Sequence, residues 1–571
     1  MQLQEILDEA IKLHEEGLLE KADFLYEQIL TQETENPDIW NLAGVASWQI
    51  GNYHQSLERM EEAIRLDDNQ AHYHNNIGNA YQSMEKYEPA IESYLYAIQL
   101  KDDFAQAWTN LGAAYHELGR NIEARKAHEK AITIDNSHSG ALYNLGKLLL
   151  HLNDYAASEF YLHKAHEIDP HDIDILVTLG RLYVTTQNFK VGRSMFAEAL
   201  SLTEMNPGII AEMASSYYEE GDIESALARL RTAVNLAPDN TDLLTQYGLM
   251  LNEMQLVQEA AKCFHTVLNQ DSNNYTAWKG LGDTLKISGN HEDALRALNR
   301  AISLKPDYDQ AWLQTANILY EKARNENDEL GSKTFQLAQT AYEHTLKCNP
   351  KDGLAKLMLT ILKNENLDAI PDSYVEDLFN CYAPRFENHL QKTLQYNTPK
   401  DLFRILQEGT SCQFQKALDL GCGTGLMGDK IRTYVQELHG VDLSVRMLQK
   451  AKRKGVYDSL HRGNLLSHVS NNHGFDLITA SDVLIYFGKL EKVFQAVHAA
   501  LTDGGLFLFS VEKEPVEDLK LQLNGRYTHG KKYVEGIAAR AGFTLILSKE
   551  LQLRTENKVW VNGLGYLYRK G

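Results

Sequence analysis

A period of about 34 residues, repeated from Leu3 onward, limits the possible folds more than any other feature of the chain. When the sequence is divided into units of this length, the eighth position of each unit is glycine or alanine. These ten residues are Ala10, Gly44, Gly78, Gly112, Gly146, Gly180, Ala214, Gly248, Gly282 and Ala316. Alanine recurs at the twenty-seventh position, and tryptophan at the fourth. Such a period indicates stacked units rather than one globular core.

The residue types at these phases predict pairs of helices. A small residue lets two helices approach closely, and larger apolar side chains fill the groove between them. Proline at the thirty-second position of some units, such as Pro170, ends the second helix. The pattern in "AWTNLGAAYHELGRNIEARKAHEKAITID" (107–135) resembles the tetratricopeptide repeat. This resemblance implies an α-solenoid of ten repeats over residues 3–352 and a protein or peptide as its partner.

The tenth unit departs from the pattern. Its second helix arrives late, after the polar insert "NENDELGSK", which we interpret as a loop between its helices. Residues 353–372 follow as a predicted capping helix, "GLAKLMLTILK", and a linker to a third region, 373–571.

Charge divides the chain unevenly. Residues 1–372 hold 30 Lys and Arg against 57 Asp and Glu, a net charge of −27, whereas residues 373–571 hold 26 against 21, a net charge of +5. An acidic repeat region disfavours nucleic acid and favours a neutral or basic partner, although acids also serve simply to keep a surface soluble.

The remaining composition indicates a cytoplasmic protein. No apolar run approaches the roughly 18 residues of a membrane span, and the start, "MQLQEILDEAIKLHEEG", has acids where a secretory signal needs a basic end. The five cysteines are scattered, so we expect neither a disulfide framework nor a metal site.

A row of asparagines is the candidate partner groove of the repeats. Asn76, Asn110 and Asn144 share the sixth position of three consecutive units, with Asn75 and Asn79 nearby. Such a row could hydrogen-bond an extended peptide backbone. Asparagine at this phase is also part of the general repeat pattern, so a structural role is the alternative.

The stretch "ALDLGCGTGLMG" (417–428) can be read in two glycine registers. From Gly423 it spells the G-x-G-x-x-G of dinucleotide folds, which need an acid about 20 residues beyond the last glycine. Asp442 falls well short of that separation from Gly428 and comes nearer to it when counted from Gly425, and Asp419 directly precedes the register that starts at Gly421. The spacing favours this second register, D-x-G-x-G-x-G, in which many methyltransferases hold S-adenosylmethionine.

The segments after this loop alternate between strand-like and helix-like, which predicts a doubly wound parallel sheet. "RGNLL", "FDLITASDVLIYF" and "LTDGGLFLFS" fall where class I methyltransferases have their third to fifth strands, and the final "TLILSKELQLRTENKVWVNGLGYLYRK" predicts an antiparallel pair. Residues 373–571 therefore resemble a class I S-adenosylmethionine-dependent methyltransferase, an α/β Rossmann-like domain with a seven-stranded sheet and antiparallel terminal strands. The whole chain resembles bacterial methyltransferases with N-terminal tetratricopeptide repeats.

The resemblance implies a set of residues that bind S-adenosylmethionine. They are Asp419, Gly421, Gly423, Gly425, Asp442, Leu443, Met447, Asn464 and Leu465. Asp419 would hold the methionyl ammonium and Asp442 the ribose hydroxyls, with Met447 and Leu465 beside the adenine. For Met447 an ordinary helix core position is the alternative. Residues 374–390, "YVEDLFNCYAPRFENHL", resemble a helix that closes over the cofactor.

Two residues are candidates for a catalytic base, which is needed only if the methyl acceptor arrives protonated. Asp482 follows the fourth strand and could instead orient the cofactor, and His529 is expected in a polar loop, where a surface role is the alternative. Tyr486, Arg526 and Tyr527 are possible substrate contacts. The motifs for methylating nucleobases, release-factor glutamine or arginine are missing.

Three functions remain open on the sequence alone. The first is a methyltransferase whose repeats recruit a protein or carrier-bound substrate. The second is a small-molecule methyltransferase whose repeats only tether it to an assembly. The third is a non-enzymatic adaptor with a relict cofactor fold, against which the intact Asp419, glycine loop and Asp442 argue.

Overall fold

A computed structural model describes residues 3–326, 329, 332–363, 368–383, 386, 395–411, 413–516, 518–522, 524–556 and 559–571. The chain forms two compact units. The first comprises Met1–Glu220 and Ala228–Leu236, and the second comprises Gly221–Leu227 and Ala237–Gly571. The second unit therefore holds the last repeats together with the region predicted to be a methyltransferase.

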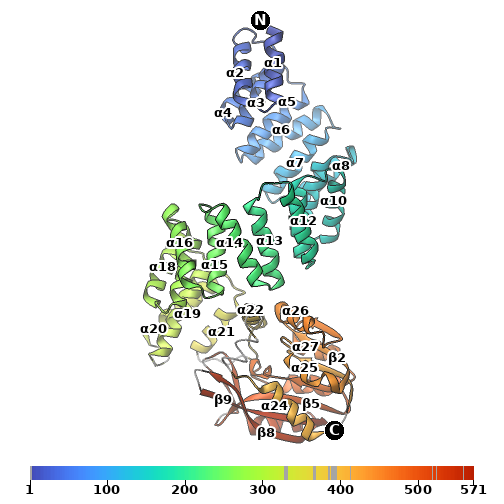
Figure 1. Ribbon diagram of the computed structural model, residues 1–571, viewed down its shortest axis with the longest axis vertical. Coiled ribbons are helices and arrows are strands. Elements are labelled where there is room, and N and C mark those ends of the chain that lie inside the picture. The colour runs from blue at the N-terminus through green and yellow to red at the C-terminus, as the bar shows by residue number, and fades with distance from the viewer. Residues whose placement is uncertain are drawn as a thin grey trace. The chain divides into compact units, whose positions relative to one another are not determined.

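The predicted α-solenoid of paired helices is confirmed (Figure 1). Its helices are α1 Leu3–Glu15, α2 Leu19–Leu30, α3 Pro37–Ile50, α4 Tyr53–Leu66, α5 Ala71–Ser83, α6 Tyr87–Leu100, α7 Ala105–Glu117, α8 Asn121–Ile134, α9 Ser139–His151, α10 Tyr155–Ile168, α11 Ile173–Thr185, α12 Phe189–Ser201, α13 Pro207–Glu220, α14 Ile223–Leu236, α15 Thr241–Glu253, α16 Val257–Gln270, α17 Tyr275–Ile287, α18 His291–Leu304, α19 Asp309–Asn325 and α20 Lys333–Cys348. Residues 327, 328, 330 and 331 of the predicted loop in the tenth unit lie outside the described residues.

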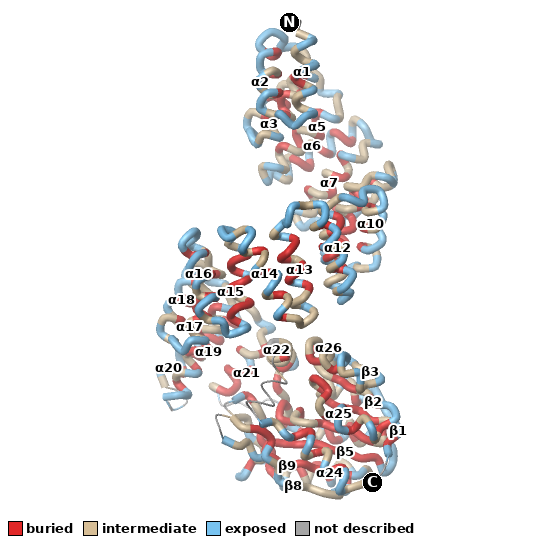
Figure 2. Tube along the Cα trace, in the orientation of Figure 1, coloured by how far each residue is buried: buried red, intermediate tan, exposed pale blue. Residues whose placement is uncertain are grey.

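The small residue at the eighth position of a unit is where its two helices meet. A Cβ atom on Gly44 would lie 2.6 Å from Cγ of Met60, and one on Gly146 would lie 2.6 Å from Cγ of Leu162. Both partners lie on the second helix of the same unit, at the same separation along the chain from their glycine. These close approaches bury one stripe of each helix, which Figure 2 shows in red. The 34-residue period therefore reflects the recurrence of one close contact between the two helices of each unit.

The tryptophans at the fourth position have a second role besides filling space. Each indole N–H donates to the backbone carbonyl six residues earlier, in the turn before its helix. The pairs are Trp40 to Thr34 at 2.8 Å, Trp108 to Asp102 at 3.0 Å, Trp278 to Ser272 at 2.9 Å and Trp312 to Pro306 at 2.9 Å. This bond ties the first helix of a repeat to the preceding turn.

The C-terminal region is a mixed nine-stranded sheet with helices on both faces. Its elements are α22 Asp372–Tyr382, α24 Thr398–Gly409, β1 Phe414–Leu420, α25 Leu426–Ile431, η2 Arg432–Tyr434, β2 Val435–Asp442, α26 Val445–Lys454, β3 Ser459–Arg462, α27 Leu465–Asn471, β4 Phe475–Ala480, η3 Leu484–Tyr486, α28 Glu491–Ala500, β5 Leu501–Glu514, β6 Leu519–Leu521, β7 Tyr527–Gly530, α29 Lys531–Arg540, β8 Phe543–Glu556 and β9 Val559–Lys570. Strands β3, β2, β1, β4 and β5 lie parallel in that order, which gives the predicted doubly wound sheet, and β9 and β8 follow as the predicted antiparallel pair.

The prediction of seven strands is wrong by two. A short hairpin, β6 and β7, is inserted after β5, and β7 pairs in parallel with the last residues of β5. Its turn contains Asn524 and Gly525, and Gly525 has a φ of 77°. Asn-Gly is a hairpin signal in any sequence, so these residues could have been predicted as a hairpin and not as a polar loop.

Alternate residues of the strands face two hydrophobic layers. On one face Leu477 and Leu508 pack with side chains of α24 and α25. On the other face Ile478 and Phe507 pack with side chains of α27, α28 and α29. Because both faces are covered, the carboxyl ends of the parallel strands are the natural place for a site, at the point where the order reverses between β1 and β4.

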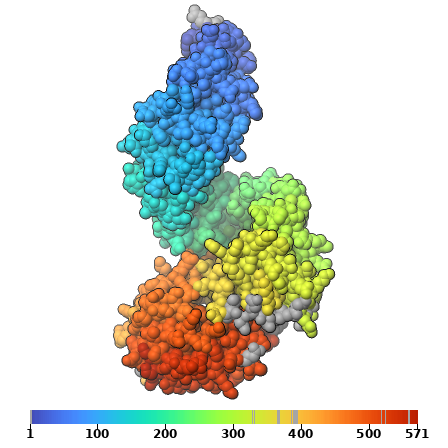
Figure 3. Space-filling model, turned by 180° about the vertical axis from the view of Figure 1, so that it is seen from behind, coloured from blue at the N-terminus to red at the C-terminus, as the bar shows by residue number. Residues whose placement is uncertain are grey.

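The solenoid ends in α21 Gly353–Leu362, the predicted capping helix, and this helix is itself buried. One hydrophobic cluster joins Tyr342 of α20 and Leu357 of α21 to Val375 of α22, Tyr486 of η3 and Tyr527 of β7. Figure 3 shows the yellow surface of the last repeats beside the orange surface of the sheet domain. A core therefore crosses residue 373, the predicted domain boundary.

The predicted linker is also fixed to the sheet domain. The N–H of Ile370 donates to the carbonyl of Tyr486 at 2.9 Å, and the N–H of Gly488 donates to the carbonyl of Asp368 at 3.0 Å. Ala369 and Phe487 form an antiparallel β-bridge between these bonds. Residues 364–367 of the linker lie outside the described residues.

Candidate active site

The loop from β1 to α25 has a backbone that requires glycine. Gly421, Gly423 and Gly425 have φ angles of 64°, 54° and 87°, a region that other residues enter at a cost of about 1–2 kcal/mol. A Cβ atom on Gly421 would collide with Val483, whereas one on Gly423 would meet open space. The loop can therefore lie directly against a ligand at Gly423.

Asp419, near the end of β1, lies beneath this loop and is 1% exposed. Tyr457 Oη donates to Oδ2 of Asp419 at 2.7 Å, and Thr479 Oγ1 donates to Oδ1 at 2.7 Å. Burial raises the pKa of Asp419 to about 6, and these two hydrogen bonds oppose the rise. At neutral pH the residue is thus a buried anion, held in one orientation, that favours a cationic group in the cavity above it.

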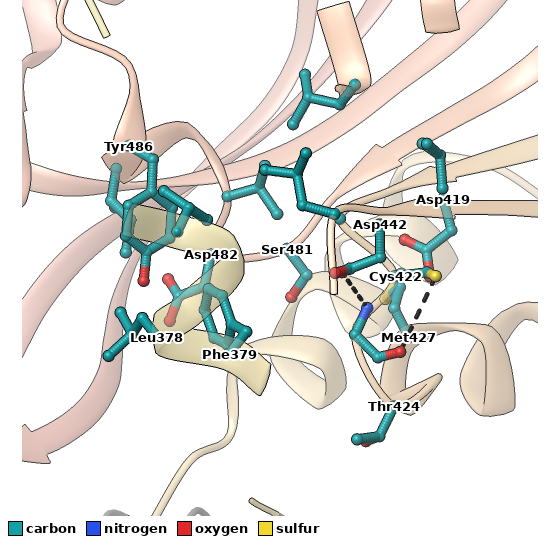
Figure 4. A pocket seen from close by; sticks show the side chains of 18 of the residues that line it. Leu378, Phe379, Asp419, Cys422, Thr424, Met427, Asp442, Ser481, Asp482 and Tyr486 are labelled. Carbon is teal, nitrogen blue, oxygen red and sulfur yellow. Dashed lines mark hydrogen bonds between the residues drawn. The ribbon is translucent and has the colours of Figure 1, made fainter. Parts of the chain in front are cut away.

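Asp442 ends β2 and faces the same loop (Figure 4). The N–H of Gly423 donates to its Oδ2 at 2.9 Å, and the N–H of Ser444 donates to its Oδ1 at 2.8 Å. Burial raises the pKa of Asp442 to about 6. Each oxygen accepts one of these backbone bonds and keeps a second lone pair, so the carboxylate can also accept from a pair of ligand hydroxyls.

Both carboxylates open into a cavity of about 420 Å³. The predicted site residues that line it are Asp419, Gly421, Gly423, Asp442, Leu443, Asn464, Leu465, Asp482, Tyr486 and Arg526. Thr424 also lines it, and its buried Oγ1 has no hydrogen-bond partner within the described part of the chain. A mostly apolar cavity with a few convergent polar groups suits a polar organic ligand.

Three predicted site residues lie behind the lining for packing reasons. Gly425 precedes the first turn of α25, and a Cβ atom on it would contact Tyr457. Met447 is fully buried on the inner side of α26, which is the helix core position named as its alternative. Tyr527 is fully buried in the cluster under the capping helix, so it braces the cavity wall.

His529 is not in a polar loop, as expected, but on β7, where it is fully buried. Its Nε2 donates to the carbonyl of Phe487 at 2.9 Å and lies 3.2 Å from that of Gly488. Burial lowers the pKa of His529 to about 4, so the ring is neutral. His529 does not line the cavity and its Nε2 holds the loop after η3, a position that argues against a role as the base.

A cluster of buried charges forms the opposite end of the cavity. Arg554 of β8 is 3% exposed and donates to Asp482 Oδ2 at 2.9 Å, to Glu556 Oε1 at 2.8 Å and to Glu512. Arg526 donates to Glu556. Among the described residues, three carboxylates thus face two guanidinium groups.

Asp482 is the member of this cluster that offers a free acceptor. Its backbone has a φ of 58°, and its N–H donates to Ser510 Oγ at 3.0 Å. Its second oxygen, Oδ1, is buried and accepts no hydrogen bond from the described residues. In Figure 4, Asp482 and Tyr486 lie on one side of Ser481, with Asp442 and Asp419 on the other. A strained backbone and an unsatisfied oxygen in a cavity keep Asp482 a candidate for a functional position.

Helix α22 covers the edge of the cavity near β2 and β3. Three contacts hold it there: Asn464 Nδ2 donates to Asp372 at 3.0 and 2.8 Å, Arg462 donates to Glu376 at 2.6 Å, and Ser444 Oγ donates to Asn380 at 2.7 Å. The Phe379 and Tyr486 rings meet edge to face with centroids 5.8 Å apart. The predicted covering helix, 374–390, is confirmed to Tyr382, and residues 384, 385 and 387–390 lie outside the described residues.

Sequence reasoning missed most partners of the predicted residues. They are Asp372, Phe379, Tyr396, Tyr457, Thr479, Glu512, Arg554 and Glu556. Thr479 lies two residues before "SDVL" on a predicted strand. Its contact with Asp419 arises because β1 and β4 are neighbours in the sheet. Arg554 offered only one signal, a charged residue amid the apolar alternation of "LILSKELQLR".

The asparagines of the candidate groove bond to one another. Asn76 Nδ2 donates to Asn41 at 3.1 Å, and Asn110 Nδ2 donates to Asn75 at 3.0 Å and to Asn79 at 2.9 Å. Both amide hydrogens of Asn110 are therefore used between repeats. These bonds favour the structural alternative for this row, and Asn144 is the half-exposed member that continues it.

Two kinds of feature are absent from the parts of the chain that the structure describes. No three His, Cys, Asp or Glu side chains come together as a metal site would need. No helix there is long and apolar enough to cross a membrane.

Comparison with family models assigns both parts of the chain. A methyltransferase domain matches residues 418–507. Tetratricopeptide repeat models match residues 37–70, 78–119, 105–138, 139–172, 253–309 and 280–331. The chain therefore carries a methyltransferase domain and tetratricopeptide repeats, repeats of a kind that mediates protein–protein interaction.

Curated relatives match parts of the chain. A malonyl-[acyl-carrier protein] O-methyltransferase of Haemophilus ducreyi is 30% identical over 22% of this chain and 54% of its own length. A trans-aconitate 2-methyltransferase of Pseudomonas aeruginosa is 35% identical over 19% of this chain and 39% of its own length. The chain thus spans about half or less of these relatives. Among solved structures, a tetratricopeptide repeat protein from Parabacteroides merdae is 18% identical, with a TM-score of 0.37, over 44% of this chain and 98% of its own.

Proposed function

We propose that this chain, which carries a methyltransferase domain and tetratricopeptide repeats, is an S-adenosylmethionine-dependent methyltransferase whose repeats recruit a protein or carrier-bound substrate. One observation carries the proposal. A buried carboxylate, Asp419, and a partly buried one, Asp442, flank a glycine loop at the reversal point of a parallel sheet, and both open into one cavity. An ammonium and a pair of hydroxyls are the groups that these carboxylates suit.

The residues present fit this cofactor. Open space over Gly423 leaves room for its backbone to approach a ligand, and the unsatisfied Thr424 hydroxyl supplies a hydrogen-bond partner there. Asp442 would accept from the ribose hydroxyls, and Asp419 would hold the methionyl ammonium electrostatically. Leu443 and Leu465 line the cavity where an adenine ring would lie.

The adenine amino group would meet a carboxylate that comes from the covering helix. Asn464 uses its oxygen to cap α27, accepting from the N–H of Ser467 at 3.1 Å. Its amide hydrogens hold Asp372, which also lines the cavity. In this chain Asp372 would therefore offer an acceptor in addition to the Asn464 oxygen.

Bound there, the sulfonium of this cofactor supplies an electrophilic methyl group, and the protein aligns the acceptor with it and excludes water. The acidic repeat region, with a net charge of −27, suits a basic protein as the recruited substrate. The acyl-carrier protein in the name of one relative supports a carrier-bound substrate.

A second candidate is a small-molecule methyltransferase whose repeats act as a tether. The trans-aconitate in the name of another relative favours it. Transfer of labelled methyl from S-adenosylmethionine into a cell extract, split into protein and small-molecule fractions, separates the two. Label in a protein band supports recruitment, and label only in small molecules supports the tether.

Cofactor binding itself is tested by calorimetry with S-adenosylhomocysteine. Asp442→Ala should weaken binding by about 100-fold, because a bidentate contact between a carboxylate and two hydroxyls is lost. Asp503→Ala is the matched control, since the Asp503 side chain is 97% exposed on the edge of the domain. Unchanged binding by Asp442→Ala, or no binding by the unaltered protein, would contradict the proposed site.

A further inference from the structure

Resting on the proposed function, we propose that the methyl acceptor is a hydroxyl or an amine that donates a hydrogen bond to Oδ1 of Asp482, and not a carboxylate. The acceptor class is the part of the reaction that neither the sheet nor the glycine loop specifies. It is decided at the charged end of the cavity, on the far side of Ser481 from Asp442 in Figure 4.

The first argument is the state of the Asp482 carboxylate. Arg554 holds Oδ2 at 2.9 Å, and the backbone N–H is held by Ser510, so the side chain has one orientation. Oδ1 is buried and lacks a partner among the described side chains and backbone, although an unpartnered carboxylate oxygen costs free energy. A ligand with an N–H or O–H would satisfy it.

The second argument is the charge at this end. Arg554 already faces Asp482, Glu512 and Glu556, and Arg526 faces Glu556. A carboxylate acceptor would bring a fourth carboxylate to the two guanidinium groups that this cluster has within the described part of the chain, and its oxygens would meet Oδ1 as acceptor against acceptor. A neutral hydroxyl or a cationic amine meets neither obstacle.

The third argument is the wall around Oδ1. Tyr486 and Phe379 line the cavity with their rings edge to face, and Tyr396 lines it with its hydroxyl 3.4 Å from Ser481 Oγ. Burial raises the pKa of Tyr396 and of Tyr486, so both hydroxyls are neutral. An aromatic wall beside one unpartnered carboxylate oxygen suits a ring or an alkyl chain that carries one donor group.

The chemistry of the transfer follows from this contact. The acceptor O–H or N–H bond breaks, and its proton passes to Oδ1 of Asp482. The electron pair left on oxygen or nitrogen bonds to the methyl carbon, while the pair of the broken sulfur–carbon bond stays on sulfur. Asp482 is then the catalytic base, and Arg554 is a positioning residue that keeps Oδ1 directed into the cavity.

Three probe molecules with the same ring test the acceptor class: phenol, benzylamine and benzoate. Their binding to the full chain saturated with S-adenosylhomocysteine is measured by calorimetry. We expect benzylamine or phenol to bind at least about tenfold more tightly than benzoate, which is the scale of a hydrogen bond to a charged group. Which of the two binds more tightly distinguishes an amine from a hydroxyl. Benzoate binding as tightly as either would overturn the proposal.

Variants test whether Asp482 causes the tighter binding of benzylamine or phenol relative to benzoate. Asp482→Asn keeps the shape and removes the charge, so the preference over benzoate should disappear, whereas Asp482→Glu should retain part of it. Asp503→Asn makes the same chemical change at an exposed site and should leave all three affinities unchanged. A preference that survives in Asp482→Asn, with an unchanged melting temperature, would contradict the assignment.

The product of the extract labelling gives an independent readout. Methyl ethers and methylamines resist mild alkali, whereas methyl esters of carboxylates release volatile labelled methanol. Stable label is expected, and release as methanol would overturn the acceptor class while leaving the proposed function intact. Failure of S-adenosylhomocysteine to bind would instead overturn the proposed function and this inference with it.

Discussion

The repeat region is stabilised by contacts between residues that are close along the chain, whereas the sheet domain is stabilised by contacts between residues that are far apart. In the repeats, a glycine meets a side chain of the very next helix, as Gly44 meets Met60, and the same contact recurs in unit after unit. In the sheet domain, the contact that orients Asp482 comes from Arg554, 72 residues away. The repeats are therefore stabilised locally and additively, whereas the sheet domain is stabilised as a whole.

The asparagine row of the repeats and the cavity of the sheet domain also differ in their polar groups. The asparagines of the repeats satisfy one another, so that Asn110 has no amide hydrogen to spare. The sheet domain leaves Thr424 Oγ1 and Asp482 Oδ1 unsatisfied in one cavity. The saturated row indicates a structural role, whereas the two unsatisfied atoms indicate a site because they meet in one cavity; single unsatisfied atoms, such as His128 Nδ1, occur among the described residues of the repeats too.

The largest expected effect tests whether the sheet domain is separable. A chain that starts at residue 373 would lose α20 and α21 and expose Val375, Tyr486 and Tyr527 of the shared cluster. Burial of large side chains contributes about 1.5–3 kcal/mol each, so this chain should be unfolded or molten. Chemical denaturation followed by near-ultraviolet circular dichroism measures it.

The matched control for this truncation starts at Ala237 and keeps the whole of the second compact unit apart from residues 221–227. It should unfold cooperatively and bind S-adenosylhomocysteine. A stable, cofactor-binding 373–571 fragment would instead show that the sheet domain does not depend on the repeats.

The next effect is a pH dependence of stability that comes from Asp419 and Asp442 beside the glycine loop. The neutral asparagine row of the repeats has no such dependence. The pKa of Asp419 and Asp442 is raised to about 6 when folded, against about 4 in an unfolded chain. Between these values the folded state binds more protons, so these groups lower the free energy of unfolding as pH rises from about 4 to 6. Full ionisation of Asp419 costs about 3 kcal/mol. Denaturant titrations across this pH range measure the change.

Cofactor affinity should increase as pH rises, because the ionised carboxylates would bind the ammonium and the ribose hydroxyls. Binding of S-adenosylhomocysteine should tighten from pH 5 to pH 7 by about tenfold for each carboxylate with a pKa near 6, and so by about 100-fold for the two together. Calorimetry across this range measures it, and Asp442→Asn should flatten the profile. Affinity that is constant with pH would argue against both assignments.

The smallest effect lies in the repeats. Asn110→Ala removes bonds to Asn75 and Asn79, and it should lower the free energy of unfolding by about 1–2 kcal/mol. Because the repeats are stabilised locally, methyl transfer to small acceptors should be unchanged. Asn144→Ala is the comparison, since it alters the same row. Loss of protein labelling in Asn144→Ala at unchanged stability would assign the row to partner binding.

The same contrast explains how far the sequence could predict the structure. The repeats follow from one phase, because Gly44 and its equivalents meet partners at a constant separation. The order of the first five strands and the position of Asp442 follow from spacing. The burial of His529 and the pairing of Asp482 with Arg554 could not be foreseen, because they depend on which distant strands become neighbours. Only the hairpin that contains His529 had a local signal, its Asn-Gly turn.

The β-bridge between Ala369 and Phe487 attaches the segment that follows the last repeats directly to the loop beside the cavity. If a substrate anchors on the last repeats, its anchoring segment and its methylated atom must be separated by a set span. Substrates would then be selected by a molecular ruler, by how far the reactive atom stands from the anchor, as much as by the chemistry around it.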